Sequence, residues 1–327
     1  MRTVECNVAS EIRVLSTDLV SAQFEQDHAD AHLVAVDDSS GPRAQCSLWW
    51  SQAPMLEHSR LGTIGHYQAQ DDASAQVLLD AARDRLRAAG CSRAIGPMDG
   101  SSWRRYRFVT EAGTEPAFFL EPQNPPEWPR QFVTAGFVPL ASYYSSLNSD
   151  LSRQDSRLSK AEARLRSQSV VLRSLKAGEV ELYLPRIYRM CCVAFKNSYL
   201  YTEMTQRDFL QQYDKLLPLL CGDLLIVAER QSETVGFLFA VPDLLRRKHA
   251  LPFDTFIIKT LAILPRRQLG GLGAVLVGRA QLIGAQLGFR RCIHALMQAE
   301  NRLARNISDV YATPMRRYTL YTQDLRS

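Results

Sequence analysis

A basic, glycine-rich turn between an apolar run and an amphipathic stretch constrains this chain most. The apolar run over 256–264 is long and branched enough for a buried strand, which Pro265 ends. The segment RRQLGGLG follows over 266–273, and apolar residues then recur every three or four positions from Leu272 to Leu287. This pattern predicts a strand, a turn and a helix entered from the glycines. Such a turn presents unpaired backbone N–H groups at the positive end of a helix dipole, which favours anion binding.

Two common phosphate-binding motifs do not fit this turn. A Walker loop requires Lys and then Ser or Thr after its glycine, but Ala274 follows Gly273. A dinucleotide fingerprint would need glycine in place of Leu276 and an acidic residue about 20 positions further on. The spacing Gln268-x-x-Gly271-x-Gly273 instead resembles the Gln/Arg-x-x-Gly-x-Gly/Ala signature of the GNAT acyltransferases.

The residues after the turn resemble the same family in the order of their elements. The segment 290–297 (RRCIHALM) is predicted to be the next strand. Asn301 and Ala304 follow with the N-x-x-A spacing of the GNAT helix after that strand, and 316–321 resembles the closing strand. The resemblance covers most of the second half of the chain. It implies an α/β fold with a mixed sheet flanked by helices, and binding of acyl-coenzyme A.

The first half repeats this order of strands and helices, which predicts two tandem GNAT-like domains. Each is expected to hold a mostly antiparallel mixed sheet with flanking helices. We predict a degenerate GNAT-like domain over 1–150, a linker over 151–169 and an acyl-coenzyme A-binding domain over 170–327. Where the second half has its glycines, the first reads QDDAS over 70–74. Two carboxylates suit a helix start but repel a pyrophosphate, so we expect no coenzyme A there.

One loop of the first half has two interpretations. The segment 96–106 (GPMDGSSWRRY) places Trp and Tyr beside arginines. It is either a surface loop with an aromatic anchor or a lid that faces a flat or anionic substrate.

The resemblance also implies which residues hold the acyl-coenzyme A, a co-substrate that requires no metal. In the family, the strand before the turn pairs with the pantetheine arm, the turn holds the pyrophosphate, and the asparagine contacts the arm near its sulfur. Carried over to this sequence, the cofactor-binding residues are Leu261, Ala262, Ile263, Arg266, Arg267, Gln268, Leu269, Gly270, Gly271, Leu272, Gly273, Ala274 and Asn301.

The catalytic residues follow the family less closely. A neutral amine attacks the thioester, so a base removes a proton and an acid protonates the leaving thiolate. The family's tyrosine lies seven residues after the asparagine, where this chain has Ser308. Tyr311 is our first choice for the acid, with Tyr318 and Tyr321 as alternatives. For the base we choose His294, because its ordinary pKa lies near neutrality; the alternative is a hydrogen-bonded core histidine.

Composition bounds the location and the partners. The chain has 327 residues, of which 46% are hydrophobic and 22% charged, with a net charge of +5. This charge suits an anionic ligand but is too small to indicate nucleic acid. No run of about 18 apolar residues exists, and the N-terminus carries charges where a secretory signal is apolar. Seven cysteines without a C-x-x-C pair indicate reduced thiols. We expect a cytoplasmic monomer or homodimer with no membrane partner.

These observations predict an acyl-coenzyme A-dependent N-acyltransferase, in the first place an N-acetyltransferase. Its acceptor is expected to be a primary amine on a small molecule, an amino acid or a peptide-like metabolite. One alternative is a non-catalytic acyl-coenzyme A sensor or scaffold, which the departure at Ser308 favours. Another is a transferase whose donor is carried on acyl carrier protein or tRNA, and the intact pyrophosphate turn argues against it.

Overall fold

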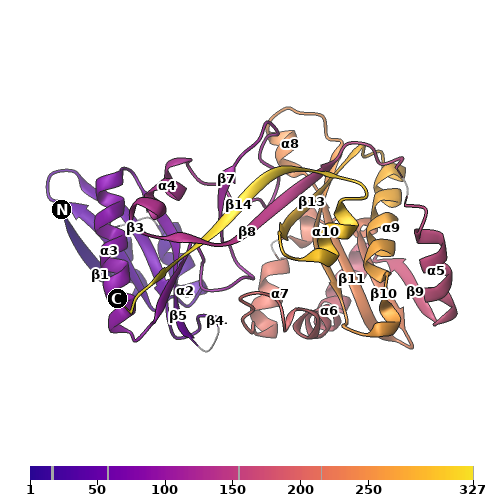
Figure 1. Ribbon diagram of the computed structural model, residues 1–327, viewed down its shortest axis with the longest axis horizontal. Coiled ribbons are helices and arrows are strands. Elements are labelled where there is room, and N and C mark those ends of the chain that lie inside the picture. Colours follow the sequence, from indigo (N-terminus) through magenta and orange to yellow (C-terminus); the bar gives the residue numbers. More distant parts are fainter. Residues whose placement is uncertain (16–17, 57–58, 154, 215, 327) are drawn as a thin grey trace.

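The computed structural model describes residues 1–15, 18–56, 59–153, 155–214 and 216–326. It has two lobes joined by two long strands (Figure 1). The first half contains, in chain order, β1 (Arg2–Cys6), α1 (Ala9–Leu15), α2 (Asp18–Gln26), β2 (Ala31–Asp37), β3 (Gly41–Trp49), β4 (Met55–Leu56), β5 (Ser59–Ala69), α3 (Asp72–Ala88), β6 (Arg93–Gly96), β7 (Phe108–Glu111), α4 (Glu127–Thr134) and β8 (Val138–Asn148). The second half contains α5 (Leu158–Ser167), β9 (Val170–Ser174), α6 (Val180–Phe195), α7 (Gln206–Asp214), β10 (Leu225–Arg230), β11 (Glu233–Pro242), α8 (Leu244–Lys248), β12 (Thr255–Ile263), α9 (Leu272–Gln286), β13 (Arg291–Gln298), α10 (Arg302–Ser308) and β14 (Thr313–Asp324).

A single mixed sheet runs through both halves. In the described residues it has 14 strands in the order β1-β2-β3-β5-β6-β14-β8-β13-β12-β11-β10-β9, with β4 paired to β5 and β7 paired to β14. The pairs β5–β6 and β12–β13 are parallel, and the other pairs are antiparallel. The predicted fold class, a mixed and mostly antiparallel sheet flanked by helices, is confirmed.

The last strand of each half is exchanged into the sheet of the other half. Next to β6 of the first half lies β14, and next to β13 of the second half lies β8. Tyr321 on β14 therefore stands opposite Gly96, and Cys292 on β13 opposite Asn148. Both chain ends lie at the same lobe for this reason (Figure 1). The domain ranges proposed from the sequence remain a prediction, but the sheet itself crosses them.

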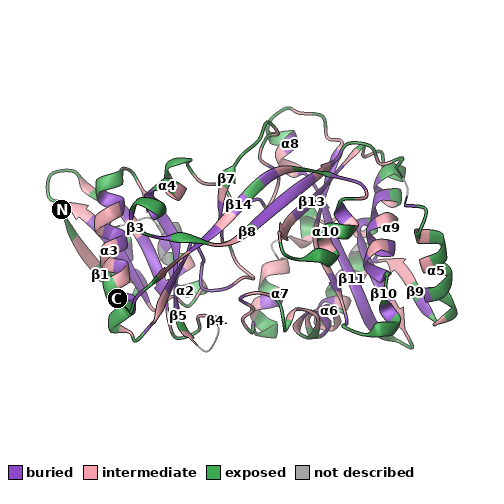
Figure 2. Cartoon of the chain, in the orientation of Figure 1, coloured by how far each residue is buried: buried purple, intermediate pink, exposed green. Residues whose placement is uncertain are grey.

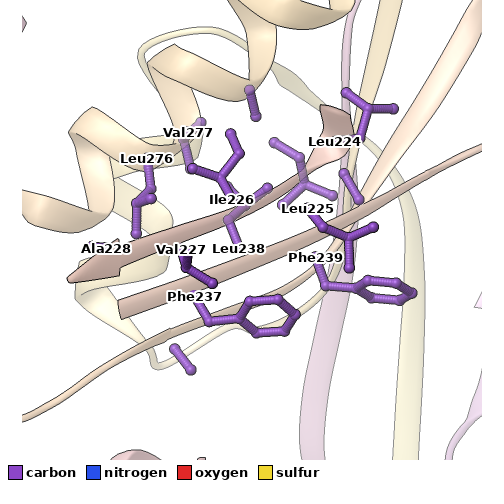
Figure 3. Close-up of a cluster of buried hydrophobic side chains, with 14 of the residues drawn as sticks. Leu224, Leu225, Ile226, Val227, Ala228, Phe237, Leu238, Phe239, Leu276 and Val277 are labelled. Atoms are coloured by element: carbon purple, nitrogen blue, oxygen red, sulfur yellow. The ribbon is translucent and has the colours of Figure 1, made fainter. Parts of the chain in front are cut away.

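The core of the second half lies on both faces of its sheet. Side chains alternate along β11, so Leu238 points toward Leu276 and Val277 of α9, whereas Phe237 and Phe239 point to the other face (Figure 3). Helix α6 packs on β11 and β12 as well. Buried residues follow the central strands through both lobes, and exposed residues collect on the helices and loops (Figure 2).

The elements around the glycine turn match their predictions. The strand expected over 256–264 is β12, the helix over 272–287 is α9, and the strand over 290–297 is β13, each within a residue or two. The polar stretch that we expected to be a linker holds α5, which packs on α9. Gly278 is the point of closest approach, since a Cβ there would lie 2.3 Å from Leu158 Cδ1.

Candidate active site

The site begins where β12 and β13 separate. The two strands pair only over 255–258 and 291–294. Beyond this point β13 bulges between His294 and Met297, and Leu296 adopts a left-handed backbone with φ 60°. The N–H of Leu296 remains hydrogen-bonded, because it donates to Ser145 Oγ on β8 at 3.0 Å. The exchanged strand thus holds β13 away from β12, and a V-shaped opening remains between the two parallel strands.

The glycine turn lies at the end of β12. Gly271 has φ +81°, a left-handed conformation that glycine adopts without strain, and it immediately precedes α9. The first helical hydrogen bond runs from Val275 N–H to Gly271 O, so the amides of 272–274 begin the helix without intrahelical acceptors. A Cβ at Gly273 would lie 3.1 Å from both Ile263 Cδ1 and Ile307 Cδ1. Gly273 is therefore closely packed between β12 and α10, where a side chain would not fit without a shift of its neighbours.

The predicted phosphate-binding arginines differ from each other in the structure. Arg266 pairs with both carboxylate oxygens of Glu233 at 2.6 Å, so Glu233 already balances its positive charge. Arg267 and Gln268 are exposed. A cation that the sequence reasoning missed lies here instead: Arg164 of α5 donates to Gly270 O and stands beside Gly271. Its position depends on how α5 packs on α9, for which the sequence carries no motif.

The remaining predicted cofactor residues lie along the same path. Leu261 borders the opening, while Ala262 is buried and Ile263 faces Gly273. Leu269 and Leu272 are buried and anchor the turn, and Ala274 is half-buried. Asn301 lies at the mouth of the opening, and its Oδ1 accepts from Ala304 N–H at 3.1 Å, which caps α10.

A cavity of about 680 Å³ fills the space below the opening. We call it the junction cavity, because the loop 102–107 of the first half and the α6–α7 region of the second half both line it. Its inner wall consists of 259–261 on β12 and 296–298 on β13. Trp103 closes one side, with its ring against Phe195 and Phe209 and its Nε1 donating to Thr202 O at 2.9 Å.

The loop over 96–106 therefore faces a cavity, which favours the lid interpretation over a plain surface loop. It also fills the corresponding opening of the first half, between β5 and β6. Met98 N–H donates to Ile64 O at 2.8 Å, and Asp99 Oδ1 accepts from His66 N–H at 2.7 Å. At the start of α3, Asp71 accepts from Ser74 N–H at 2.8 Å. In the described chain, the first half thus keeps neither the strand opening nor the bare helix start.

Two cations, the half-buried Lys259 and the buried Arg107, face the junction cavity. Lys259 on β12 donates through Nζ to Leu120 O at 2.9 Å, and burial, together with the positive charge of Arg107, lowers the pKa of this lysine to about 7. Arg107 is only 6% exposed and lies between the rings of Tyr106 and Tyr143, at 3.7 and 4.0 Å from their centres. Sequence reasoning missed both, although Lys259 interrupts an apolar strand.

The one carboxylate among the described lining residues is already neutralised. Glu121 accepts from Tyr318 OH and pairs with Arg316, and both partners are buried. Burial raises the pKa of Glu121, while these contacts oppose the rise. The net charge that the cavity wall presents is therefore positive.

The predicted catalytic residues lie together but elsewhere. His294 Nδ1 is 3.0 Å from Ser308 Oγ, and its ring centre is 6.4 Å from that of Tyr311. All three side chains are buried, and none lines the junction cavity in the part of the chain described. Burial lowers the pKa of His294 to about 4, so it is neutral at pH 7. Tyr311 lies after α10, not on it. Their catalytic roles remain predictions, and the cavity geometry gives them no support.

Comparison with solved structures identifies the class of fold. The GCN5-related glucosamine N-acetyltransferase region of a fungal multi-domain GH3 beta-N-acetylglucosaminidase superposes with a TM-score of 0.53 at 15% identity over 98% of this chain. The chain spans 38% of that protein. A GCN5-related N-acetyltransferase from Sphaerobacter thermophilus gives 0.52 at 11% identity, covering 100% of this chain and 96% of that one. A tandem GNAT protein from the clavulanic acid biosynthesis pathway gives 0.51 at 10%, covering 91% and 83%.

The chain has the fold of the tandem GNAT proteins. No family model and no curated protein matches its sequence, so the similarity rests on structure. Over the described ranges, no group of three His, Cys, Asp or Glu residues is arranged to hold a metal ion. No helix in those ranges is both long enough and apolar enough to cross a bilayer.

Proposed function

We propose that the protein is an acyl-coenzyme A-dependent N-acyltransferase whose second half binds the donor and whose junction cavity takes the amine. One observation carries the proposal: β12 leads from the cavity, through the strand opening, to a bare helix start. The wall at 259–261 and the glycine turn thus belong to one continuous segment. Direct transfer requires this connection, because much of its rate comes from holding donor and amine together.

The residues at the turn fit a coenzyme A pyrophosphate. The amides of 272–274 precede the first intrahelical hydrogen bond, and the helix dipole favours an anion at this end of α9. Arg164 and Arg267 are the nearby cations that would add charge, whereas Arg266 is held by Glu233. When bound, the donor supplies a thioester whose C–S bond breaks as the amine nitrogen forms the C–N bond, so that the thiol leaves.

Lys259 is the side chain best placed to take the proton of the amine. With a pKa of about 7 it is close to half neutral at pH 7, and a neutral Nζ has a lone pair to accept the proton. It lies on β12, the strand that precedes the glycine turn, and its side chain lines the cavity.

The test is thermal stabilisation by acetyl-, malonyl- and long-chain acyl-coenzyme A. A ligand that binds only the folded state at 100 times its Kd adds about 2.7 kcal/mol to the free energy of unfolding. Gly271→Glu places a carboxylate at the open helix start and should weaken donor binding at least tenfold. Gly288→Glu is the matched control, since Gly288 ends the same helix, has φ +89° and has open space around it.

The outcomes separate the alternatives. Stabilisation that Gly271→Glu removes and Gly288→Glu retains supports donor binding, and release of free thiol with an amine then supports transfer. Stabilisation without thiol release from any amine favours the sensor or scaffold. No stabilisation by any of the donors overturns the proposal and leaves a carrier- or tRNA-borne donor.

A further inference from the structure

Many aromatic side chains line the walls of the junction cavity. Rings come from the loop of the first half, from β8, from the α6–α7 region and from β11, and six of them are Trp103, Tyr106, Tyr143, Tyr199, Tyr201 and Phe239. Aromatic pairs in such walls prefer edge-to-face contacts, as Tyr106 and Tyr143 show at 5.5 Å. A ligand with a flat apolar body gains contacts of the same kind.

Arg107 is a buried charge without a carboxylate partner in the described chain. Its Nη1 donates to Leu296 O at 3.1 Å and its Nε to Tyr106 O at 3.2 Å. These carbonyls are neutral, and the nearby carboxylate of Glu121 is engaged by Arg316. A guanidinium remains protonated at all ordinary pH values, and burying it without a counter-charge is costly. An anionic group on a ligand would supply this counter-charge.

Backbone strain is concentrated around the same cation. Arg107 itself has φ 70°, in the left-handed region that non-glycine residues rarely adopt. Leu296, whose carbonyl receives Arg107, has φ 60°, and Leu120, whose carbonyl receives Lys259, has φ 64°. Each such residue costs of the order of 1–3 kcal/mol, and such strain clusters at functional sites. Here the left-handed residues Leu296 and Leu120 point their carbonyls toward Arg107 and Lys259, respectively.

We propose that the acceptor is an amine that also carries a carboxylate, of the class of the aromatic amino acids, and that Arg107 pairs with this carboxylate. This inference rests on the proposed function, which assigns the junction cavity to the amine. An arginine fork binds a carboxylate with two parallel hydrogen bonds, and the aromatic walls receive the side chain. Arg107 and Lys259 line the same cavity, so the amino group of such a ligand is placed toward Lys259.

Binding of three related probes to the full chain, without donor, tests the inference. L-Phenylalanine has the amine, the carboxylate and the ring; phenethylamine lacks the carboxylate, and 3-phenylpropionate lacks the amine. We expect phenylalanine to bind at least about tenfold more tightly than phenethylamine, since a hydrogen-bonded charge pair contributes about that much. Arg107→Gln should remove this difference while leaving phenethylamine unchanged. Arg317→Gln is the control, because Arg317 pairs with Glu111 on the surface.

Several results would overturn the inference. The inference is overturned if the wild type binds phenethylamine as tightly as phenylalanine, or if Arg107→Gln binds phenylalanine as tightly as the wild type does. If Arg107→Gln does not fold, the three probes on the wild type decide the role of the carboxylate alone. If acyl-coenzyme A binds and none of the probes does at millimolar concentration, the acceptor class is wrong and the proposed function stands. If neither donor nor probe binds, both fail.

Discussion

Replacing Lys259 by methionine removes a cation from the inner wall of the junction cavity while keeping a long, unbranched side chain. The Nζ of this lysine donates a hydrogen bond to Leu120 O at 2.9 Å. Arg107 and Glu121 are the charged groups that act on it, the first lowering and the second raising its pKa. Desolvation has a larger effect on this pKa than either charged group, so the charged form of Lys259 is disfavoured in the folded state.

The magnitude follows from the pKa of Lys259, which is 10.5 in the unfolded chain and about 7 in the fold. At about 1.4 kcal/mol for each tenfold change, the cost of burying the charge is of the order of 5 kcal/mol. This cost is fully present below pH 7, where Lys259 is protonated in both the folded and the unfolded state. Between pH 7 and 10.5 the unfolded state binds more protons, so stability rises with pH and the cost disappears. The lost hydrogen bond subtracts about 1 kcal/mol from the gain.

We therefore expect Lys259→Met to raise Tm by about 5 °C at pH 7 and by almost nothing at pH 10. Thermal unfolding of both proteins at the two pH values measures this difference. Lys160→Met, at an exposed position of α5, should change Tm little at either pH. The same substitution at 259 should lower the rate of transfer by at least about a hundredfold. An equal change in Tm at pH 7 and pH 10 would refute the reasoning, because the effect would then not come from the proton.

Two further predictions concern Arg164 on α5 and Ser308 on α10. Arg164→Ala should raise the Kd of acyl-coenzyme A up to about fivefold, and less so at high salt, because the contact is exposed. Arg166→Ala on the same helix is its control, and equal effects in titrations of the two variants would contradict the role of Arg164. Ser308→Ala should leave the rate of transfer within about twofold while lowering Tm, because His294 loses its partner; a large loss of rate at unchanged Tm would restore Ser308 to the catalytic site.

The sequence was sufficient for the part of the site that depends on local pattern. An apolar run, a glycine turn and a helical periodicity lie within 256–287, so their physical causes are all local. The left-handed conformation of Gly271 follows from the same segment, since glycine is the residue that enters it without strain. The two carboxylates at the start of α3 likewise have a local cause, because Asp71 caps that helix.

The parts that the sequence could not provide depend on contacts between distant segments. An alternating strand such as β14 shows which residues face the core, but not which strands lie on either side of it. The exchange of β8 and β14 therefore leaves no trace in the periodicity. Lys259 carries a similar ambiguity, because a lysine in an apolar strand indicates an opening only when the neighbouring strand is known to diverge. The ordinary pKa of His294 likewise takes no account of burial, which lowers that pKa to about 4, because burial depends on segments distant in the sequence.

The first half contributes to the junction cavity through the exchanged strands, although its own helix α3 starts at a capped end. β8 pairs with β13 where β13 has left β12, and Ser145 on β8 accepts the N–H of Leu296 at the bulge. The first half further supplies Arg107 and the carbonyl that holds Lys259. Its own opening is closed by the same loop that lines the cavity. If the proposed function is correct, the two halves contribute to a single site, with donor contacts on the second half and acceptor contacts on both.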